Sequence, residues 1–185
     1  MQNRSPNIEN LYLLARIARD SSDNETALRY YETLLNFAHE DWEPAFFSAY
    51  FHCSVRKTEK DCELFAKELQ RVFYSIAQIR NESQLLDAVN LVAAYSATLA
   101  ISVKDEAVMR YNDATVQTRA VLKTVHKRLG HKAAQIVMLL LDSLLLYFSE
   151  NPVVMKQYRP IYSDLCLFSD FITTEEKSRY RDKLK

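Results

Sequence analysis

The chain has 185 residues, of which 48% are hydrophobic and 26% are charged, as in an ordinary folded globular protein. Its 24 basic residues balance its 24 acidic residues, so no net charge favours nucleic acid or an anionic membrane. Gly130 is the only glycine and there are four prolines, which leaves little material for β-hairpin turns or phosphate-binding loops. The composition therefore favours helices joined by short polar turns.

Helix start signals divide the N-terminal part of the chain. Asn7 can cap a first helix that runs to about Asp20. The segment Ser22 to Glu25 has the pattern of a capping box, which predicts a second helix ending near Ala38. Asp41 can cap a third helix, because the proline three residues later falls in the first turn, where the amide needs no partner.

Two more start signals predict long helices in the middle of the chain. Thr58 to Asp61 opens a fourth helix that ends near Ile79. Asn81 to Gln84 opens a fifth helix that reaches at least Val103. The residues that follow are polar but contain no helix breaker, so the end of this helix is left open between residues 103 and 115.

The last third of the chain contains the single glycine and two further start signals. We expect a sixth helix to end just before Gly130, because glycine suits a left-handed C-cap. Lys132 to Ser149 is apolar nearly all round and predicts a central seventh helix. Asn151 and Thr173 to Glu176 begin the last two helical segments, with Pro160 as a break between them.

The apolar stretches and the cysteines bear on location. Ala88 to Val103 and Ile136 to Phe148 fall short of the roughly 20 residues of a membrane span, so we expect buried helices and no membrane. Cys53, Cys62 and Cys166 form no C-x-x-C pair and follow no secretory leader. This favours a reducing, cytoplasmic compartment.

The first two predicted helices resemble the tetratricopeptide repeat, a helix pair of about 34 residues. With Ile8 as its first position, the packing positions of the repeat fall on Leu11, Leu14, Ala15, Ala27, Tyr31 and Leu34. We expect one all-α domain over residues 1–185, in which antiparallel hairpins form a bundle or a short right-handed superhelix of about 7–9 helices. Residues 8–55 form its tetratricopeptide-like part and residues 58–185 its long-helix part.

A wider resemblance covers most of the chain. It is carried by the segments ENLYLLARIARDSSDNETALRYYETLL, DWEPAFFSAYF, RLGHKAAQIVMLLL and YRDKLK. These are similar to a group of bacterial helical proteins of unassigned function that often follow an N-terminal zinc ribbon. The sequence has no paired cysteine motif for such a ribbon, so the metal-linked roles of those proteins do not transfer.

The sequence shows no catalytic or metal-binding pattern. The four histidines and three cysteines match neither H-E-x-x-H nor a standard zinc set. The paired acids Glu40 and Asp41, and Glu175 and Glu176, lie at helix starts, where the helix dipole favours them. We therefore expect no enzyme activity, no cofactor and no bound metal.

The resemblance to the tetratricopeptide repeat implies a binding face. In such repeats the first helix of each pair lines the concave side, so Tyr12, Arg16 and Arg19 become candidates for partner contact, and Tyr50 on the third helix joins them. Two guanidinium groups beside an aromatic ring suit a carboxylate, which predicts an acidic or C-terminal peptide. In the competing interpretation the arginines only pair with neighbouring acids.

Three functions are compatible with these observations. The first is a non-enzymatic protein-interaction or scaffolding module in which a helical groove accepts a peptide or a partner helix. The second is a self-associating structural protein, in which the acidic first hairpin of one copy meets the basic middle of another. The third, and least favoured, is a nucleic-acid accessory factor that uses the acid-free stretch from Lys123 to Lys132.

Overall fold

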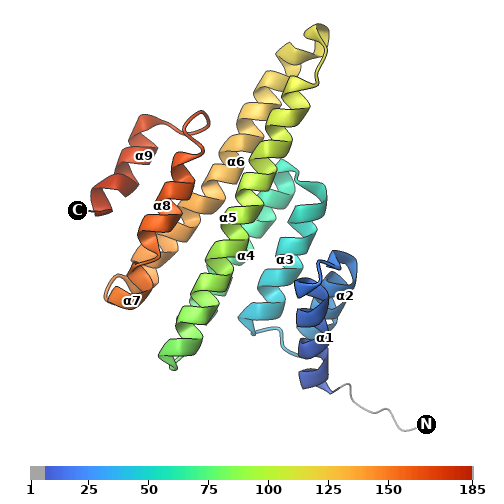
Figure 1. Cartoon of the computed structure of the whole chain (residues 1–185), viewed down its shortest axis with the longest axis vertical. Helices are drawn as coiled ribbons and strands as arrows, with labels where there is room; N and C mark the ends of the chain where they lie inside the picture. Colours follow the sequence, from blue (N-terminus) through green and yellow to red (C-terminus); the bar gives the residue numbers. More distant parts are fainter. Residues whose placement is uncertain (1–6, 185) are drawn as a thin grey trace.

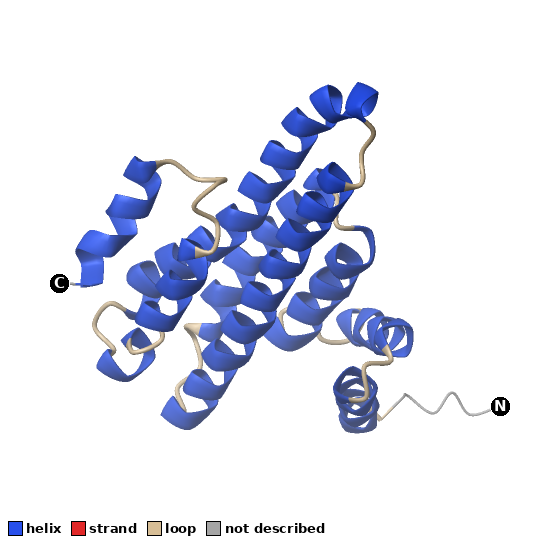
Figure 2. Cartoon of the chain, turned by 45° about the horizontal axis from the view of Figure 1, so that its top comes forward, coloured by secondary structure: helices blue, strands red, loops and turns tan. Residues whose placement is uncertain are grey.

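The computed structural model describes residues 7–184, and within them it contains nine α-helices and no strand (Figures 1 and 2). The helices are α1 (Ile8–Asp20), α2 (Asn24–Leu35), α3 (Trp42–Arg56), α4 (Glu59–Ile76), α5 (Glu82–Asn112), α6 (Val116–Phe148), α7 (Pro152–Met155), α8 (Tyr158–Cys166) and α9 (Thr174–Arg181). A 3₁₀ turn, Asp182–Leu184, follows α9. The expected all-α class and number of helices are confirmed.

The long helices α5 and α6 lie side by side through the middle of the molecule (Figure 1). The pair α3 and α4 packs against them, with α3 next to α5 and α4 next to α6. The hairpin of α1 and α2 lies beyond α3, and α7 to α9 flank α6 on the other side. The connected ends of α5 and α6 project past all the other helices (Figure 2).

Most of the helix starts follow from local side-chain chemistry. An N-cap side chain accepts a hydrogen bond from an amide in the first turn at Asn7, Asp41, Thr58, Asn81, Asn151 and Thr173. Each of these starts is predicted from the sequence, because a cap needs only residues within one turn of itself. They set the helix boundaries on which the packing depends.

The capping box expected at Ser22 is wrong by one residue. Asp23 is the N-cap of α2 and accepts from the amide of Thr26. Ser22 instead ends α1 in the left-handed conformation, with φ of 61°. The amide of Asp23 donates to the carbonyl of Ala18 and that of Ser22 to Arg19, which together form a Schellman ending. A residue used for one helix end is not free to cap the next.

The helix end expected before Gly130 is also wrong. Gly130 lies inside α6, which continues from Val116 to Phe148. The ring of Phe171, from the connection between α8 and α9, occupies the space where a Cβ of residue 130 would be. The carbonyl of Phe171 is also 3.0 Å from Nδ1 of His131. Glycine is needed here for close packing between segments rather than for a turn.

Helix α6 is consequently longer than expected, whereas α5 ends at Asn112, within the range left open by the sequence. Each contains an 18-residue window apolar enough to cross a membrane by length and composition, with mean hydropathies of 1.5 and 1.4. This corrects the expectation that both stretches are too short. In the structure, 44% of the window in α5 and 61% of that in α6 is buried against other helices. Core helices and membrane spans share these lengths and compositions, so the helices do not determine location.

The buried side chains form a single cluster that runs from α1 to α9. Of the packing positions expected in the first hairpin, Ala15, Ala27, Tyr31 and Leu34 are fully buried. Leu14 differs, because 42% of its surface is exposed.

The contact between Gly130 and Phe171 predicts that Gly130→Ala destabilises the protein when Phe171 is present and stabilises it when Phe171 is absent. Gly130→Ala should destabilise the protein by up to about 2 kcal/mol, because overpacking costs about 1–3 kcal/mol and exceeds the roughly 1 kcal/mol gain in helix propensity. In a Phe171→Ala background the same change should stabilise by about 1 kcal/mol. Urea unfolding of the four proteins measures both effects. Stabilisation by Gly130→Ala in both backgrounds would contradict the packing role of the glycine.

Candidate interaction site

A carboxylate buried near the start of α3 organises the N-terminal part of the molecule. Asp41 caps this helix, and its Oδ1 accepts from the backbone amide of Glu43 at 3.0 Å. The cap places Glu43 in the first turn, where the helix dipole favours an anion. Only 5% of Glu43 is exposed. A carboxylate so deeply buried needs cationic or hydrogen-bonding partners.

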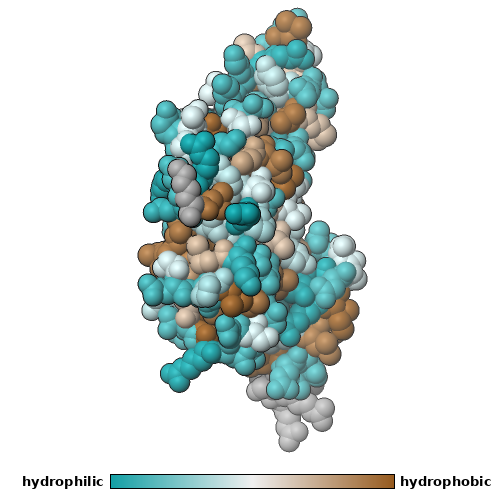
Figure 3. Space-filling view, turned by 60° about the vertical axis from the view of Figure 1, so that its left-hand side comes forward, coloured by the Kyte–Doolittle hydropathy of each residue, from teal (hydrophilic) through white to brown (hydrophobic). Residues whose placement is uncertain are grey.

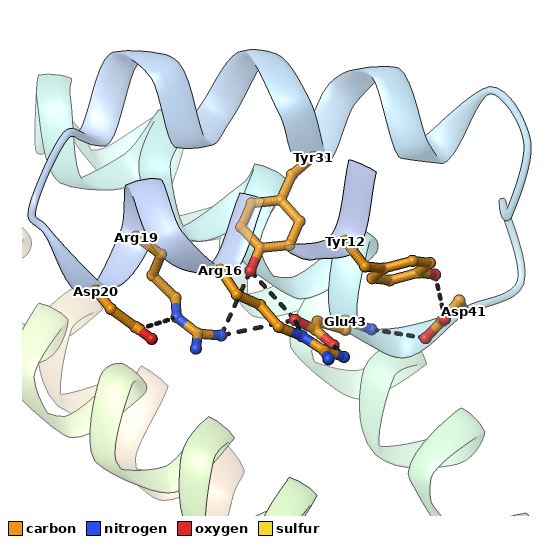
Figure 4. A network of polar contacts seen from close by, with 7 residues as sticks. All are labelled: Tyr12, Arg16, Arg19, Asp20, Tyr31, Asp41 and Glu43. Carbon is orange, nitrogen blue, oxygen red and sulfur yellow. Dashed lines mark hydrogen bonds and ion pairs between the residues drawn. The ribbon is translucent and has the colours of Figure 1, made fainter. Parts of the chain in front are cut away.

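Two arginines of α1 supply those partners (Figure 4). Arg16 donates from Nε to Glu43 Oε1 at 2.9 Å and from Nη2 to Oε2 at 2.5 Å, a bidentate pair. Arg19 lies with Nη1 3.6 Å from Glu43 Oε1, and its Nε donates to Asp20 at 2.8 Å. The Arg19 guanidinium also lies over the ring of Phe47, 4.8 Å from its centroid. The guanidinium groups of both arginines are therefore paired with carboxylates of the same chain.

Two tyrosines complete the network (Figure 4). The hydroxyl of Tyr31, on α2, donates to Glu43 Oε1 at 3.2 Å and accepts from Arg19 at 3.4 Å. The hydroxyl of Tyr12, on α1, donates to Oδ2 of Asp41. The polar network thus joins three helices, α1, α2 and α3, around one carboxylate.

Three groups of the network have raised pKa values. The pKa of Tyr12 is raised by burial and by its hydrogen bond to Asp41. Burial and the charge of Glu43 raise the pKa of Tyr31. The hydrogen bond to Glu43 raises the pKa of Arg16, despite partial burial. These three groups therefore stay protonated at neutral pH, which suits a structural network better than proton transfer.

A cleft of about 600 Å³ lies beside this network, between α1 and the first half of α5. One wall holds Arg16, Arg19, Asp41 and Glu43, and the other comes from the connection between α4 and α5 and from α5 itself. The lining residues from outside the network are Trp42, Ile79, Gln84, Asp87, Ala88 and Leu91. The cleft thus combines an aromatic and aliphatic surface with charged side chains around it.

The unpaired charge in the cleft is negative. Arg16 and Arg19 are matched by Glu43 and Asp20. Asp87 is exposed and takes part in no ion pair among residues 7–184. The acidic peptide expected from the sequence would have to displace an internal carboxylate from each arginine. Asp87 is therefore the charge in the cleft lining that internal ion pairs leave unmatched.

The four residues predicted for partner contact occupy different environments. Arg16 and Arg19 line the cleft, although only Arg16 is widely exposed, at 51% of its side chain against 11% for Arg19. Tyr12 lies outside the lining, but it contacts two lining residues: its hydroxyl donates to Asp41, and the Arg16 guanidinium lies over its ring, 5.5 Å from the centroid. Tyr50 is half-buried and packs edge-on against Tyr95, with ring centroids 5.1 Å apart.

Sequence reasoning missed the contribution of α5. Asp87 and Leu91 lie four residues apart on the side of α5 that faces the cleft. Four-residue spacing on a helix indicates a shared face, but it does not reveal which distant helix that face meets. The position of Glu43 opposite Arg16, 27 residues away, is likewise a product of the tertiary fold.

Within residues 7–184, no group of three or more histidine, cysteine, aspartate or glutamate side chains is placed to hold a metal ion. His126 stacks on Tyr111, with ring centroids 4.9 Å apart, and its Nδ1 lies 3.2 Å from the carbonyl of Ala107. His52 pairs with Glu32 on the protein surface at 2.9 Å. These two histidines have packing or surface partners.

The network predicts unequal effects for two acidic residues. Glu43→Ala should lower the free energy of unfolding by about 2–4 kcal/mol, because it leaves two guanidinium groups without their buried partner. Asp20→Ala, the control, removes an exposed partner of Arg19 and should cost less than about 1 kcal/mol. Urea titrations of both variants make the comparison, and equal losses would show that the buried carboxylate does not hold the hairpin.

Comparisons of the chain with models of protein families, with curated proteins and with solved structures give no significant match. They neither support nor contradict the resemblance to the tetratricopeptide repeat. The argument for function therefore depends on the geometry of the cleft and on the distribution of charge.

Proposed function

We propose that the protein is a non-enzymatic protein-interaction or scaffolding module, and that the cleft between α1 and α5 accepts a helix or peptide of a partner protein. The observation that carries this proposal is the composition of the cleft. Trp42 and Leu91 offer hydrophobic surface, while Asp87 supplies an unpaired charge at the rim. An amphipathic helix laid in a hydrophobic groove is a common mode of peptide recognition.

The chemistry of the cleft narrows the class of partner. Arg16 and Glu43 neutralise each other, so the wall formed by α1 adds no free positive charge at that point. A basic side chain of the partner would meet Asp87, and apolar residues one turn away along the partner helix would cover Leu91 and Trp42. The partner segment is therefore an amphipathic one with lysine or arginine beside apolar residues.

The resemblance of the first hairpin to the tetratricopeptide repeat supports this proposal, because such hairpins present their first helix to a ligand. We also propose that the chain is related to the bacterial helical proteins that it resembles. We further propose that it is located in the cytoplasm. Three free cysteines support that location.

Selection from a library of displayed random peptides tests the cleft without a known partner. The enriched peptides should carry a basic residue beside apolar residues at helical spacing. Binding should fall by at least about tenfold in Asp87→Lys and in Leu91→Glu, because each change reverses or removes one of the two contacts.

Two matched controls place charge elsewhere on the same long helices. Asp105→Lys changes an exposed carboxylate further along α5, and Leu146→Glu changes an exposed leucine of α6. Both should bind the peptides like the parent protein. Enrichment of acidic peptides, or equal binding by Asp87→Lys and the parent, would contradict the proposal.

A second candidate function, self-association, is favoured by charges at the projecting end of α6. Arg128 and Lys132 pair with Glu59 and Glu63 of α4, at 3.2 and 3.0 Å. Lys123 and Lys127, one turn apart on α6, are exposed and have no carboxylate partner in the part of the chain that the structure describes. Because two cations of the acid-free stretch are already paired, nucleic-acid binding receives the least support of the three functions.

The opposite end of the molecule carries the complementary surface. Leu13 and Ile17 of α1 are more than half exposed. Glu9 and Glu25, on α1 and α2, are exposed and have no ion pair among residues 7–184. Figure 3 shows hydrophobic side chains, in brown, at the upper tip and on the lower right of the molecule. A head-to-tail contact between copies would join these two ends.

Charge reversal tests self-association. We expect the parent to associate at low salt, and Lys123→Glu with Lys127→Glu, or Glu9→Lys with Glu25→Lys, to be monomeric by analytical ultracentrifugation. An equimolar mixture of the two double variants should associate again, because each end then meets its opposite charge. Reversal of Lys156 and Lys183, near the C-terminus, is the control. A parent that stays monomeric at low salt would exclude this function.

A further inference from the structure

Two cysteines that form no known sequence motif are neighbours in the structure. Cys53 lies in the last turns of α3 and Cys62 in the first turn of α4. Between them, Lys57 takes the left-handed conformation, with φ of 50°, and Thr58 caps α4. This tight reversal brings the two Sγ atoms to 3.9 Å, and each residue is 1% exposed. Among the described residues both are free thiols.

The two thiols are not equivalent. The thiol of Cys53 donates a hydrogen bond to Sγ of Cys62. That bond lowers the pKa of Cys62 and, together with burial, raises the pKa of Cys53. Cys62 also lies near the N-terminus of α4, where the helix dipole favours a thiolate, although burial and the nearby Asp61 oppose it. Cys62 is therefore the better nucleophile of the pair.

Each of the two cysteines is among the residues that line a separate groove. Cys62 lines a groove of about 490 Å³ formed by α4, α6 and α9. Cys53 lines a groove of about 460 Å³ formed by α2, α3 and α4. Hydrogen peroxide in the groove of about 490 Å³ would therefore lie beside Cys62, and because that residue is 1% exposed, a local opening has to uncover its sulfur.

We propose that Cys53 and Cys62 form a redox modification site, in which a hydroperoxide converts the two thiols into a disulfide that links α3 to α4. The proposal is independent of the ligand of the cleft.

The reaction balances with hydrogen peroxide as the two-electron oxidant. The Cys62 thiolate attacks one peroxide oxygen, the O–O bond breaks, and the leaving hydroxide takes a proton to become water. The resulting sulfenic acid is then attacked by the sulfur of Cys53, which forms the S–S bond and releases a second water. The sulfur atoms must approach by about 2 Å to reach the length of a disulfide.

The reduced protein, residues 1–185, and hydrogen peroxide suffice for the test. The number of free thiols should fall from three to one, because Cys166 on α8 has no partner cysteine in contact. Digestion with trypsin without reduction should release residues 30–56 joined to residues 61–67, and dithiothreitol should separate them. The variant Cys166→Ser should give the same joined peptide.

Single serine variants test the assignment of roles. In Cys53→Ser the sulfenic acid of Cys62 has no thiol to react with, so dimedone should label residue 62. In Cys62→Ser dimedone should leave Cys53 unlabelled under the same conditions, and circular dichroism checks that both variants remain helical. The proposal is overturned if the parent keeps three thiols, if it forms only dimers, or if Cys62 reaches the sulfinic acid without the joined peptide.

Discussion

The ion pair between Arg16 and the buried carboxylate of Glu43, supported by Arg19 and Tyr31, is the interaction on which the proposed site depends. A carboxylate with 5% exposure stabilises the fold only when its charge is met, and both cations come from α1. The pair therefore fixes α1 against the start of α3. Because α3 packs on α5, the same contact sets the width of the cleft between α1 and α5.

This constraint changes the expected chemistry of recognition. Arginines on the first helix of a hairpin suggest an anionic ligand when only the sequence is considered. In the structure their guanidinium groups already pair with Glu43 and Asp20, so Asp87 remains as the unpaired charge in the cleft, and the proposed partner is basic for that reason. The same reasoning applies to the acid-free stretch of α6, where Glu59 and Glu63 of α4 neutralise half of the apparent basic surface. Charges left after internal pairing are better guides to partners than the charges of the sequence.

The sequence predicts those features that depend on neighbours within a turn. Asn7, Asp41 and Thr58 cap helices as expected, because a cap needs only a side-chain oxygen and nearby amides. The role of Gly130 cannot be predicted locally, because it is set by Phe171, which is 41 positions away along the chain. The contact of Cys53 with Cys62 matches no cysteine motif, although a short turn between two predicted helices could have suggested it. The cleft itself could not be predicted, since it is formed by faces of helices that no local pattern brings together.

Hydrogen exchange by mass spectrometry, with and without a peptide selected for binding, tests the central claim most directly. Amides slow their exchange where a ligand covers or stabilises a helix. The account predicts added protection in α1, at the start of α3 and in the first half of α5, with no change in residues 116–127 of α6. Protection confined to the projecting end of α5 and α6, or absent from the first half of α5, would contradict it.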